Sequence, residues 1–284
     1  MVIRDLLREA TAALKQGGCD NAVFEAHWIL RTVLEMSPIG LVLQGGEKAE
    51  DEKIKTVREI VRKRLGHEPL QYLLGSQEFM SLELIVTPDV LIPRADTEIL
   101  VEHVLAEKLN QGFLALDIGT GSGCIALSLA HYNKRAYVRG VDISQRALAV
   151  ARRNAEKLAL AERVAFDKCD IMQPTLYGKY DVIVSNPPYI ETDVIPTLDQ
   201  NVRNFEPYGA LDGGVDGLDF YRQITRIAPK YLNGDGMLAF EVGHTQAEKV
   251  AALLSSDFTN IQIINDLCGI PRVVSGIKKE THLI

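Results

Sequence analysis

Downstream of residue 95, short apolar stretches alternate with segments of helical periodicity, and this alternation constrains the fold more than any other feature of the sequence. The expected strands are 113–118, 136–141, 162–167, 180–185, 236–242, 260–265 and 271–277, and the expected helices are 97–109, 122–132, 144–157, 217–231 and 244–256. The pattern predicts an α/β fold whose mostly parallel, seven-stranded sheet carries helices on both faces. No helix separates the last two strands, so we expect them to pair antiparallel.

Residues 1–75 have a different pattern and predict a small helical domain. Apolar side chains recur there at the 3.6-residue period of a helix face. They are Ile3, Leu6, Leu7, Ala10 and Leu14, then Ala26, Leu30, Val33 and Leu34, and then Ile54, Val57, Val61 and Leu65. Gly75 ends the helical pattern. The segment is long enough to have a core of its own.

Residues 76–94 are expected to form a β-hairpin that links the helical domain to the α/β domain, residues 95–284. Alternating apolar side chains at Leu82 and Leu84 would share one face of a strand. Pro88-Asp89 is a turn signal, and the apolar residues 90–92 would begin the second strand.

The composition is that of a globular protein. Hydrophobic residues make up 46% and charged residues 24% of the 284 positions, as in proteins with a sizeable core. The four cysteines form no CxxC pair and the six histidines no HExxH pattern, so we predict neither a metal site nor a disulfide framework. No apolar run reaches the ~20 residues that span a bilayer, and the first residues lack a signal-peptide profile. We therefore expect a reduced cytoplasmic protein that does not enter a membrane.

The net charge of −7 falls entirely on residues 76–284, because residues 1–75 contain 11 basic and 11 acidic side chains. An acidic α/β domain argues against a long nucleic-acid duplex as the substrate, since phosphates are bound by clustered Lys and Arg. A basic cluster does lie between Lys53 and Arg64, and we interpret it as a solvated helix face.

A glycine-rich segment directly follows the first expected strand of the α/β domain. Gly119, Gly121 and Gly123 allow a tight turn and a close approach between backbone and ligand. Thr120 and Ser122 lie between them, and the next helix begins near Ser122, so its free N–H groups face the same ligand. A dinucleotide-binding fingerprint would read GxGxxG, but here the third glycine comes one residue early. The spacing therefore favours an adenosyl-amino-acid cradle over a pyrophosphate cradle.

Three further residues at strand ends are candidate cofactor contacts. Asp142 closes the second strand, about 20 residues beyond the glycines, where a carboxylate can accept both ribose hydroxyls. Its alternative role is to cap the next helix, which Ser144 can already do. Asp170 follows the third strand and could accept the adenine amino group, or be a surface carboxylate. Ile171 beside it could pack on the adenine face.

The fourth strand runs into Asn186-Pro187-Pro188-Tyr189, at the sheet edge where open α/β sheets bind ligands. The side-chain carbonyl of Asn186 can accept a hydrogen bond from an NH2 group. Pro187 and Pro188 have a fixed φ and no N–H, so this stretch presents only carbonyl acceptors. The ring of Tyr189 can stack on a planar group and can stabilise a nearby sulfonium by about 0.5–2 kcal/mol.

Two acceptors that hold both hydrogens of one NH2 group suit a nitrogen whose lone pair is delocalised. Holding both hydrogens aims the lone pair at a methyl donor, and most of the rate gain comes from this orientation. No strong base is needed, since the N-methylated cation is very acidic. We therefore predict an S-adenosylmethionine-dependent methyltransferase whose catalytic residues are Asn186, Pro187 and Tyr189.

On these motifs the sequence resembles the release-factor glutamine methyltransferase family, whose members methylate the Gln of the Gly-Gly-Gln motif in bacterial class I peptide chain release factors. The likeness covers nearly the whole chain, and includes residues 87–94, 119–123, 185–190 and 213–218. It implies a Rossmann-like class I methyltransferase domain, S-adenosylmethionine as the cofactor, and a helical N-terminal domain that docks a release factor.

The resemblance also implies roles for individual residues. Residues 119–123, Asp142 and Asn186 correspond to cofactor contacts, and residues 186–189 correspond to the glutamine-binding residues. Ile171 corresponds to a cofactor contact that is often aromatic in the family.

Other functions share this motif. Adenine amino methyltransferases of DNA or RNA carry a similar Asn-Pro-Pro-Tyr, because adenine N6 and a glutamine amide are both planar NH2 groups. A methyltransferase for a ribosomal-protein glutamine would have the same site, and a non-catalytic adenosylmethionine sensor would bind without turnover. The N-terminal domain and hairpin favour a glutamine, and the intact Asn186 and Tyr189 argue against a sensor. We expect a monomer whose partner is a release factor, with no direct nucleic-acid substrate.

Overall fold

The computed structural model describes residues 1–109 and 111–280, which form two compact units. One comprises Met1–Gly75 together with Asp199–Phe205, and the other comprises Ser76–Leu198 and Glu206–Ile284. The predicted α/β domain extends to residue 284, and its last four residues, 281–284, lie outside the described residues.

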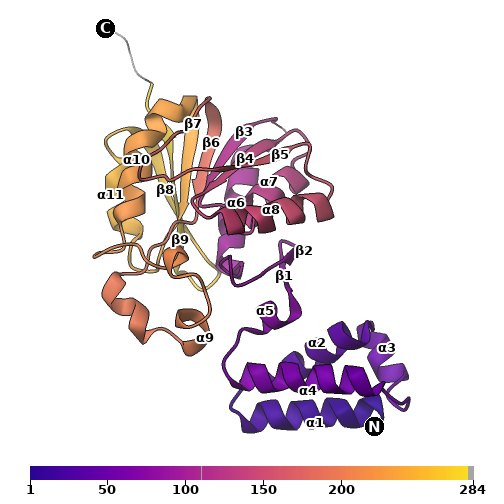
Figure 1. The fold of residues 1–284 in the computed structure, drawn as a ribbon. Helices are drawn as coiled ribbons and strands as arrows, with labels where there is room; N and C mark the ends of the chain where they lie inside the picture. The colour runs from indigo at the N-terminus through magenta and orange to yellow at the C-terminus, as the bar shows by residue number, and fades with distance from the viewer. Residues whose placement is uncertain (110, 281–284) are drawn as a thin grey trace. The chain divides into compact units, whose positions relative to one another are not determined.

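The first unit is helical, as predicted (Figure 1). Its helices are α1 (Ile3–Gln16), α2 (Ala22–Leu34), α3 (Pro38–Leu43), α4 (Asp51–Leu65), α5 (Leu70–Leu74) and α9 (Gln200–Arg203). The predicted apolar faces form its core, in which Leu6, Leu14 and Leu30 are fully buried, except that Leu65 at the end of α4 is exposed. The sequence did not predict α3, because this helix is too short for a periodic pattern. Ser37 caps it by accepting a hydrogen bond from Gly40 N at 3.0 Å.

In the second unit, seven of the described strands form one sheet in the order β5-β4-β3-β6-β7-β9-β8. They are β3 (Leu114–Ile118), β4 (Tyr137–Asp142), β5 (Val164–Lys168), β6 (Tyr180–Ser185), β7 (Leu232–Glu241), β8 (Phe258–Asn265) and β9 (Pro271–Lys278). The first five pair parallel, and β8 pairs antiparallel with β9. Because β9 also pairs antiparallel with β7, the last strand inserts between its two predecessors. The predicted mostly parallel sheet with an antiparallel final pair is confirmed.

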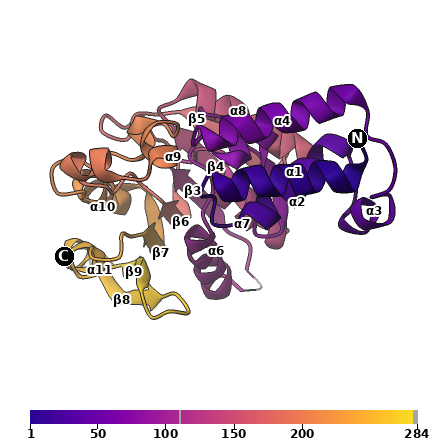
Figure 2. The same cartoon turned by 90° about the horizontal axis from the view of Figure 1, so that it is seen from below.

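Helices cover both faces of this sheet, and Figure 2 gives a second view of the layers. One face carries α6 (Ala95–Glu107), α7 (Cys124–Tyr132) and α8 (Gln145–Lys157), and the other carries α10 (Asp219–Tyr231) and α11 (Ala247–Leu254). Two short 3₁₀ helices, Thr192–Thr197 and Tyr208–Ala210, lie between β6 and α10. Successive strand residues serve opposite cores, since Ala115 packs in one and Leu116 in the other.

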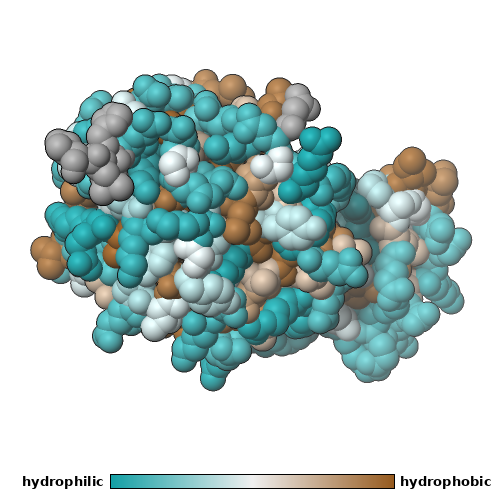
Figure 3. Space-filling model, turned by 90° about the horizontal axis from the view of Figure 1, so that it is seen from above, coloured by the Kyte–Doolittle hydropathy of each residue, from teal (hydrophilic) through white to brown (hydrophobic). Residues whose placement is uncertain are grey.

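The surface of the molecule is mixed. Hydrophilic side chains prevail on the face shown in Figure 3, with apolar ones scattered among them, as on most folded domains. In the part of the chain that the structure describes, no helix has the length and apolar character needed to cross a bilayer.

The predicted hairpin follows the helical unit, but its turn is not where the sequence predicted it. Strands β1 (Ser76–Phe79) and β2 (Leu82–Ile85) pair antiparallel on either side of Met80-Ser81. Pro88-Asp89 does form a turn, in which Val90 N donates to Thr87 O at 3.1 Å, but it is not the turn of the hairpin, and residues 90–92 form no strand.

Tertiary contacts explain the position of this turn. Met80 and Ser81 have φ angles of 49° and 55°, left-handed values that two-residue hairpin turns usually assign to Asn, Asp or Gly. Met80 N donates to Glu98 Oε1 of α6 at 2.6 Å, and Tyr132 OH of α7 donates to Met80 O at 2.7 Å. The helices beneath the hairpin hold a turn that the local sequence does not favour.

The hairpin belongs to the core of the α/β unit instead of forming a free linker. Phe79 and Leu84 are buried in the same core as α6, α7 and α8. Asn154 of α8 is fully buried and bonds both backbone groups of Ile85, accepting from N at 2.6 Å and donating to O at 3.0 Å. Its amide also donates to Ser122 O at 3.0 Å, so one side chain connects the hairpin to the glycine-rich segment.

We expect Asn154→Ala to destabilise the second unit, because one buried and two partly buried backbone groups would lose their hydrogen-bond partner. The free energy of unfolding should fall by about 1–3 kcal/mol in urea denaturation. Asn133→Ala is the matched control, since Asn133 also bonds backbone groups but at an exposed position. An equal fall in both variants would contradict a special role for Asn154.

Candidate active site

The carboxyl ends of four neighbouring parallel strands each lead into a segment predicted to bind a ligand. β3 pairs with both β4 and β6, and β4 pairs with β5. Gly119 follows β3, Asp142 ends β4, Asp170 lies just beyond β5, and Asn186 follows β6. The strand order therefore brings the predicted site residues to one edge of the sheet.

The glycine-rich segment forms an open cradle at the end of β3. Gly119, Gly121 and Gly123 have φ angles of 73°, 55° and 82°, which only glycine adopts without strain. A Cβ on Gly119 or Gly121 would meet no other atom closer than 4.0 Å, so the space in front of both is open. A Cβ on Gly123 would lie 3.0 Å from Phe166 Cζ. Two of the glycines therefore leave room for a ligand, and the third allows helix–sheet packing.

The side chains within the cradle point into the protein. Thr120 is 3% exposed, and its hydroxyl donates to Asp117 Oδ2 at 2.6 Å. Ser122 is 2% exposed, and its hydroxyl has no partner among the described residues. The predicted cofactor contacts of Thr120 and Ser122 can thus be made only by their backbone groups.

Asp117, at the end of β3, has a buried carboxyl group beside the cradle. Its Oδ1 has no hydrogen-bond partner among the described residues. Burial raises the pKa of Asp117 to about 7, although the hydrogen bond from Thr120 opposes the rise. An unpaired buried carboxyl oxygen beside an open cradle fits a polar ligand that would lie there.

Asp142 connects the end of β4 to the cradle. Its Oδ2 accepts from Gly121 N at 2.9 Å, and its Oδ1 accepts from Ser144 N at 2.8 Å. Each carboxylate oxygen keeps further acceptor capacity for a ribose hydroxyl. Burial raises the pKa of Asp142, and these backbone hydrogen bonds oppose the rise. Ser144 caps α8 by accepting from Ala147 N at 3.1 Å, so capping does not require Asp142.

Asp170 and Ile171 follow β5, as the sequence predicted. Asp170 is half-buried, and its Oδ1 accepts from Met172 N at 2.9 Å in a local turn. Ile171 is 8% exposed and packs into the core under α10, and its carbonyl accepts from Gln223 Nε2 at 2.7 Å. Little of the Ile171 side chain remains to pack on an adenine, so its cofactor contact stays a prediction.

Asn186 presents one end of its amide to the protein and the other to the site. Its Nδ2 donates to Thr97 Oγ1 of α6 at 3.1 Å. No described residue donates to Asn186 Oδ1. Asn186 is half-buried, so this carbonyl oxygen is available to accept a hydrogen bond from a ligand.

Other parts of the α/β unit pack against the remaining residues of the tetrapeptide. Pro187 is buried, and Tyr189 is half-buried with its carbonyl accepting from Gln246 Nε2 at 2.9 Å. A Cβ on Gly213 would lie 2.8 Å from Pro188 O, so a glycine is needed where this loop crosses the tetrapeptide. No backbone N–H of the described residues donates to the carbonyls of Pro187 or Pro188. The carbonyl of Pro187 therefore has no backbone donor among the described residues, and that of Pro188 lies against the Gly213 loop.

Three polar residues that the sequence did not predict support this site. They are Thr97, Glu241 and Gln246, which contact Asn186 or Tyr189 from α6, β7 and the start of α11. Glu241 could have been noticed as a carboxylate at the end of an otherwise apolar strand. Thr97 and Gln246 left no such signal, because their partners lie far away in the chain.

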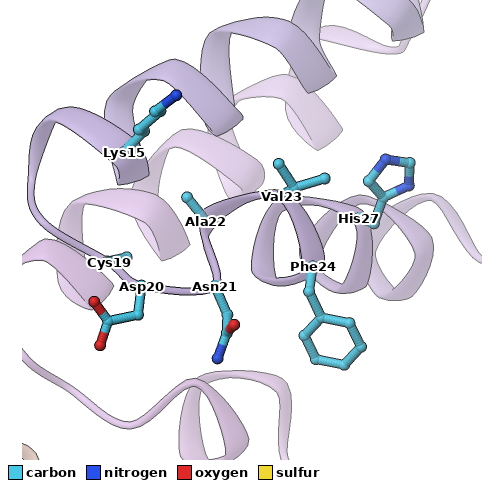
Figure 4. A pocket seen from close by; sticks show the side chains of 8 residues that line it. All are labelled: Lys15, Cys19, Asp20, Asn21, Ala22, Val23, Phe24 and His27. Atoms are coloured by element: carbon cyan, nitrogen blue, oxygen red, sulfur yellow. The ribbon is translucent and has the colours of Figure 1, made fainter.

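A cavity of about 660 Å³ lies elsewhere, on the first unit (Figure 4). It is lined by Lys15, Cys19, Asp20, Asn21, Ala22, Val23, Phe24 and His27. Most of these side chains are exposed, so the cavity is an open depression. None of the predicted site residues lines it. Within residues 1–109 and 111–280, no cluster of three His, Cys, Asp or Glu side chains is placed to hold a metal ion.

Comparisons with known proteins found both family models and full-length relatives. The model described as PrmC N-terminal domain matches residues 5–75, and the one described as methyltransferase small domain matches residues 95–201. A release factor glutamine methyltransferase from Geobacter sulfurreducens is 43% identical over 275 residues, covering 96% of either chain. One from Moorella thermoacetica is 42% identical over 284 residues, covering 99% of this chain and 100% of the relative.

Solved structures share the fold at low sequence identity. A methyltransferase from Pyrococcus furiosus aligns with a TM-score of 0.54 and 20% identity, covering 71% of this chain and 91% of its own. The hMettl16 catalytic domain, solved with the MAT2A 3′UTR hairpin 6, aligns with a TM-score of 0.58 and 15% identity, covering 82% of this chain and 84% of its own. These likenesses confirm a Rossmann-like methyltransferase fold.

Asp142→Ala should weaken S-adenosylmethionine binding about ten- to a hundredfold, because a charge-assisted pair of hydrogen bonds worth about 1.5–3 kcal/mol would be lost. Calorimetric titration measures the dissociation constant. Asp181→Ala is the matched control, since that carboxylate also accepts two N–H groups but lies at the start of β6, on the opposite edge of the sheet. An unchanged dissociation constant for Asp142→Ala would remove this residue from the site.

Proposed function

Because this chain belongs to the release factor glutamine methyltransferase family, we propose that it methylates the glutamine of the Gly-Gly-Gln motif in peptide chain release factors. The methyl group comes from S-adenosylmethionine and goes to the side-chain amide nitrogen. Two relatives show this family membership. They match this chain over 96% and 100% of their own length, and they carry this name in Geobacter and in Moorella. They do not favour a ribosomal-protein glutamine or an adenine as the substrate.

The observation that carries the proposal is the orientation of Asn186. Its NH2 group is bonded inside the protein to Thr97, and its carbonyl oxygen has no partner among the described residues. The carbonyls of Pro187 and Pro188 lie next to it without backbone donors. Two acceptors on adjacent residues can hold the two hydrogens of one amide NH2 group.

These acceptors fix the direction from which the substrate nitrogen reacts. When S-adenosylmethionine is bound, it supplies a methyl group on a cationic sulfur. Asn186 and the proline carbonyls hold the glutamine NH2 so that its lone pair points at that methyl group, and orientation of this kind can lower the barrier by several kcal/mol. The nitrogen gains the methyl group and then loses one proton, which needs no strong base.

Tyr189 completes the binding site for a planar amide. Its side chain packs against the core that contains α10 and α11. Burial is the main cause that raises the pKa of its hydroxyl, so the ring stays neutral at physiological pH. A neutral ring can stack on the amide plane and face the sulfonium.

The helical unit is the candidate docking domain for the rest of the release factor. It has a hydrophobic core of its own, and residues 5–75 match the PrmC N-terminal domain. We further infer that the enzyme works as a monomer in the cytoplasm, where release factors meet the ribosome. Analytical ultracentrifugation of the purified chain would test the monomer.

Asn186→Ala should reduce kcat strongly and change the KM for a Gly-Gly-Gln peptide much less, as for an interaction made mainly in the transition state. The variant leaves an amide N–H unpaired in a desolvated site, which costs about 1–3 kcal/mol, or about ten- to a hundredfold in rate. Single-turnover methyl transfer to the peptide measures it. Methyl transfer at the wild-type rate would show that the tetrapeptide is only a turn.

The ring of Tyr189 can be tested separately. Tyr189→Phe should be mild, because the ring remains, and Tyr189→Ala should be severe. The same single-turnover assay measures both variants. Equal losses in the two variants would assign the role to the hydroxyl and not to the ring.

Removal of residues 1–75 should damage methylation of an intact release factor and leave methylation of a short Gly-Gly-Gln peptide nearly unchanged. The peptide reaction and calorimetric cofactor binding are the internal controls, because both need only the second unit. If the truncated enzyme methylates the intact factor at the full rate, the helical unit does not dock it.

A further inference from the structure

Glu241 is a buried carboxyl group that the reaction outlined above does not use. It ends β7, is 3% exposed, and its Oε2 has no hydrogen-bond partner among the described residues. Ser185 lies opposite Phe240 in the parallel pairing of β6 and β7. Asn186 and Glu241 are the next residues of these two strands, so the sheet places the carboxyl group beside the Asn186 amide.

Thr97 completes a three-residue polar cluster with Glu241 and Asn186. It lies in the first turn of α6, is 2% exposed, and its Oγ1 accepts from Asn186 Nδ2 at 3.1 Å. The Thr97 hydroxyl and the Asn186 amide also act on the Glu241 carboxyl group as hydrogen-bonding neighbours that lower its pKa. The three side chains come from α6, from the end of β6 and from the end of β7.

An ionised carboxylate sets the direction of every hydrogen bond in this cluster. It can only accept, so the Thr97 hydroxyl must donate to it. The same hydroxyl oxygen is then the acceptor for Asn186 N–H. Because Asn186 Nδ2 is bonded to Thr97 inside the protein, the amide turns its Oδ1 to the site.

We propose that Glu241 and Thr97 are positioning residues that prevent the Asn186 amide from flipping, so that the site offers an acceptor and never a donor to the substrate. The proposal rests on the proposed function, in which Asn186 Oδ1 accepts a hydrogen of the glutamine NH2. A flipped amide would place its own NH2 against the substrate NH2, and two donors cannot bond each other. The cluster therefore also selects for an NH2 group over a carbonyl or ether oxygen.

The charge state of Glu241 makes this arrangement dependent on pH. Burial raises its pKa to about 7, and hydrogen bonds from Thr97 and Asn186 together with the charge of Arg272 oppose the rise. The ionisable groups that face Glu241 from neighbouring elements are Asp96 on α6, Arg272 on β9, Tyr189 after β6, Tyr221 on α10 and Cys124 on α7. Arg272 lies 2.9 Å from Asp96 and 3.0 Å from Asp266, so its charge is shared with two carboxylates.

The sign of the pH dependence follows from this raised pKa. Above pH 7 the carboxylate is ionised and fixes the amide. As the pH falls through about 7 the acid gains a proton and can itself donate, so the direction of the hydrogen bonds is no longer forced. The kcat for a Gly-Gly-Gln peptide should therefore fall as the pH decreases through this range.

The test compares substitutions in the full-length enzyme. Thr97→Val removes the hydroxyl without changing the shape of the side chain, and should lower kcat about tenfold or more while the dissociation constant of S-adenosylmethionine stays within about twofold. Thr97→Ser keeps the hydroxyl and should restore kcat. Thr225→Val is the matched control, because Thr225 is equally buried but its hydroxyl has no partner among the described residues.

Glu241→Gln tests the charge. A glutamine amide can face the cluster with either end, so kcat should fall about tenfold, and the part of the pH step near 7 that Glu241 causes should disappear while that of Asp117 remains. In protein with ¹³C-labelled glutamate carboxyl groups, the signal that is absent from Glu241→Gln should titrate near pH 7. This NMR readout does not depend on activity.

Each outcome has a definite consequence. A kcat for Thr97→Val within about twofold of wild type, or a cofactor affinity that falls as far as kcat, would overturn the positioning role. So would a Glu241 carboxyl signal that does not titrate near pH 7. If Asn186→Ala is slow and Thr97→Val is normal, the positioning proposal fails and the proposed function stands. If Asn186→Ala is normal, the proposed function itself fails.

Discussion

The central strand β3 lies between β4 and β6 with all three strands parallel, and both halves of the candidate site depend on this placement. Parallel strands end at the same edge, so the glycine cradle, Asp142 and Asn186 become neighbours although many residues separate them in the chain. The connections that parallel pairing requires also supply the helices that bury both faces. The parallel arrangement of these strands therefore positions the core, the cofactor cradle and the residues that bind the substrate NH2 group.

Burial of carboxyl groups is the second common feature of the site. Asp117 and Glu241 each have a pKa raised to about 7, and each has one oxygen without a partner in the described residues. Burying such groups opposes folding unless they are paired. Their position at the ends of β3 and β7, beside the cradle and beside Asn186, indicates that they serve binding and orientation. The glycines at 119, 121 and 213 also serve the site. Because they lack a Cβ, they leave room where a ligand or another backbone segment approaches.

The position of the hairpin turn depends on residues that are distant in the sequence. The sequence contains a strong turn signal at Pro88-Asp89 and none at Met80-Ser81, yet the hairpin turns at the latter, and Pro88-Asp89 forms a separate turn after β2. Glu98 and Tyr132 stabilise that turn from two helices that follow it in the chain. The order of the last three strands is a similar case. Pairing of β8 with β9 follows from the missing helix, whereas insertion of β9 beside β7 depends on contacts across the whole sheet.

The sequence by itself determined the helical first domain, the parallel sheet and the residues at its carboxyl edge. Hydrophobic periodicity and strand-end motifs involve only residues that are close together in the chain. Only the tertiary structure decided how those residues are oriented. The side chains of Thr120 and Ser122 turn inward, Ile171 packs into the core, and Asn186 directs its carbonyl outward because Thr97, distant in sequence, takes its N–H. A side chain's hydrogen-bond partners are set by packing between elements, and the spacing of residues along the chain does not encode that packing.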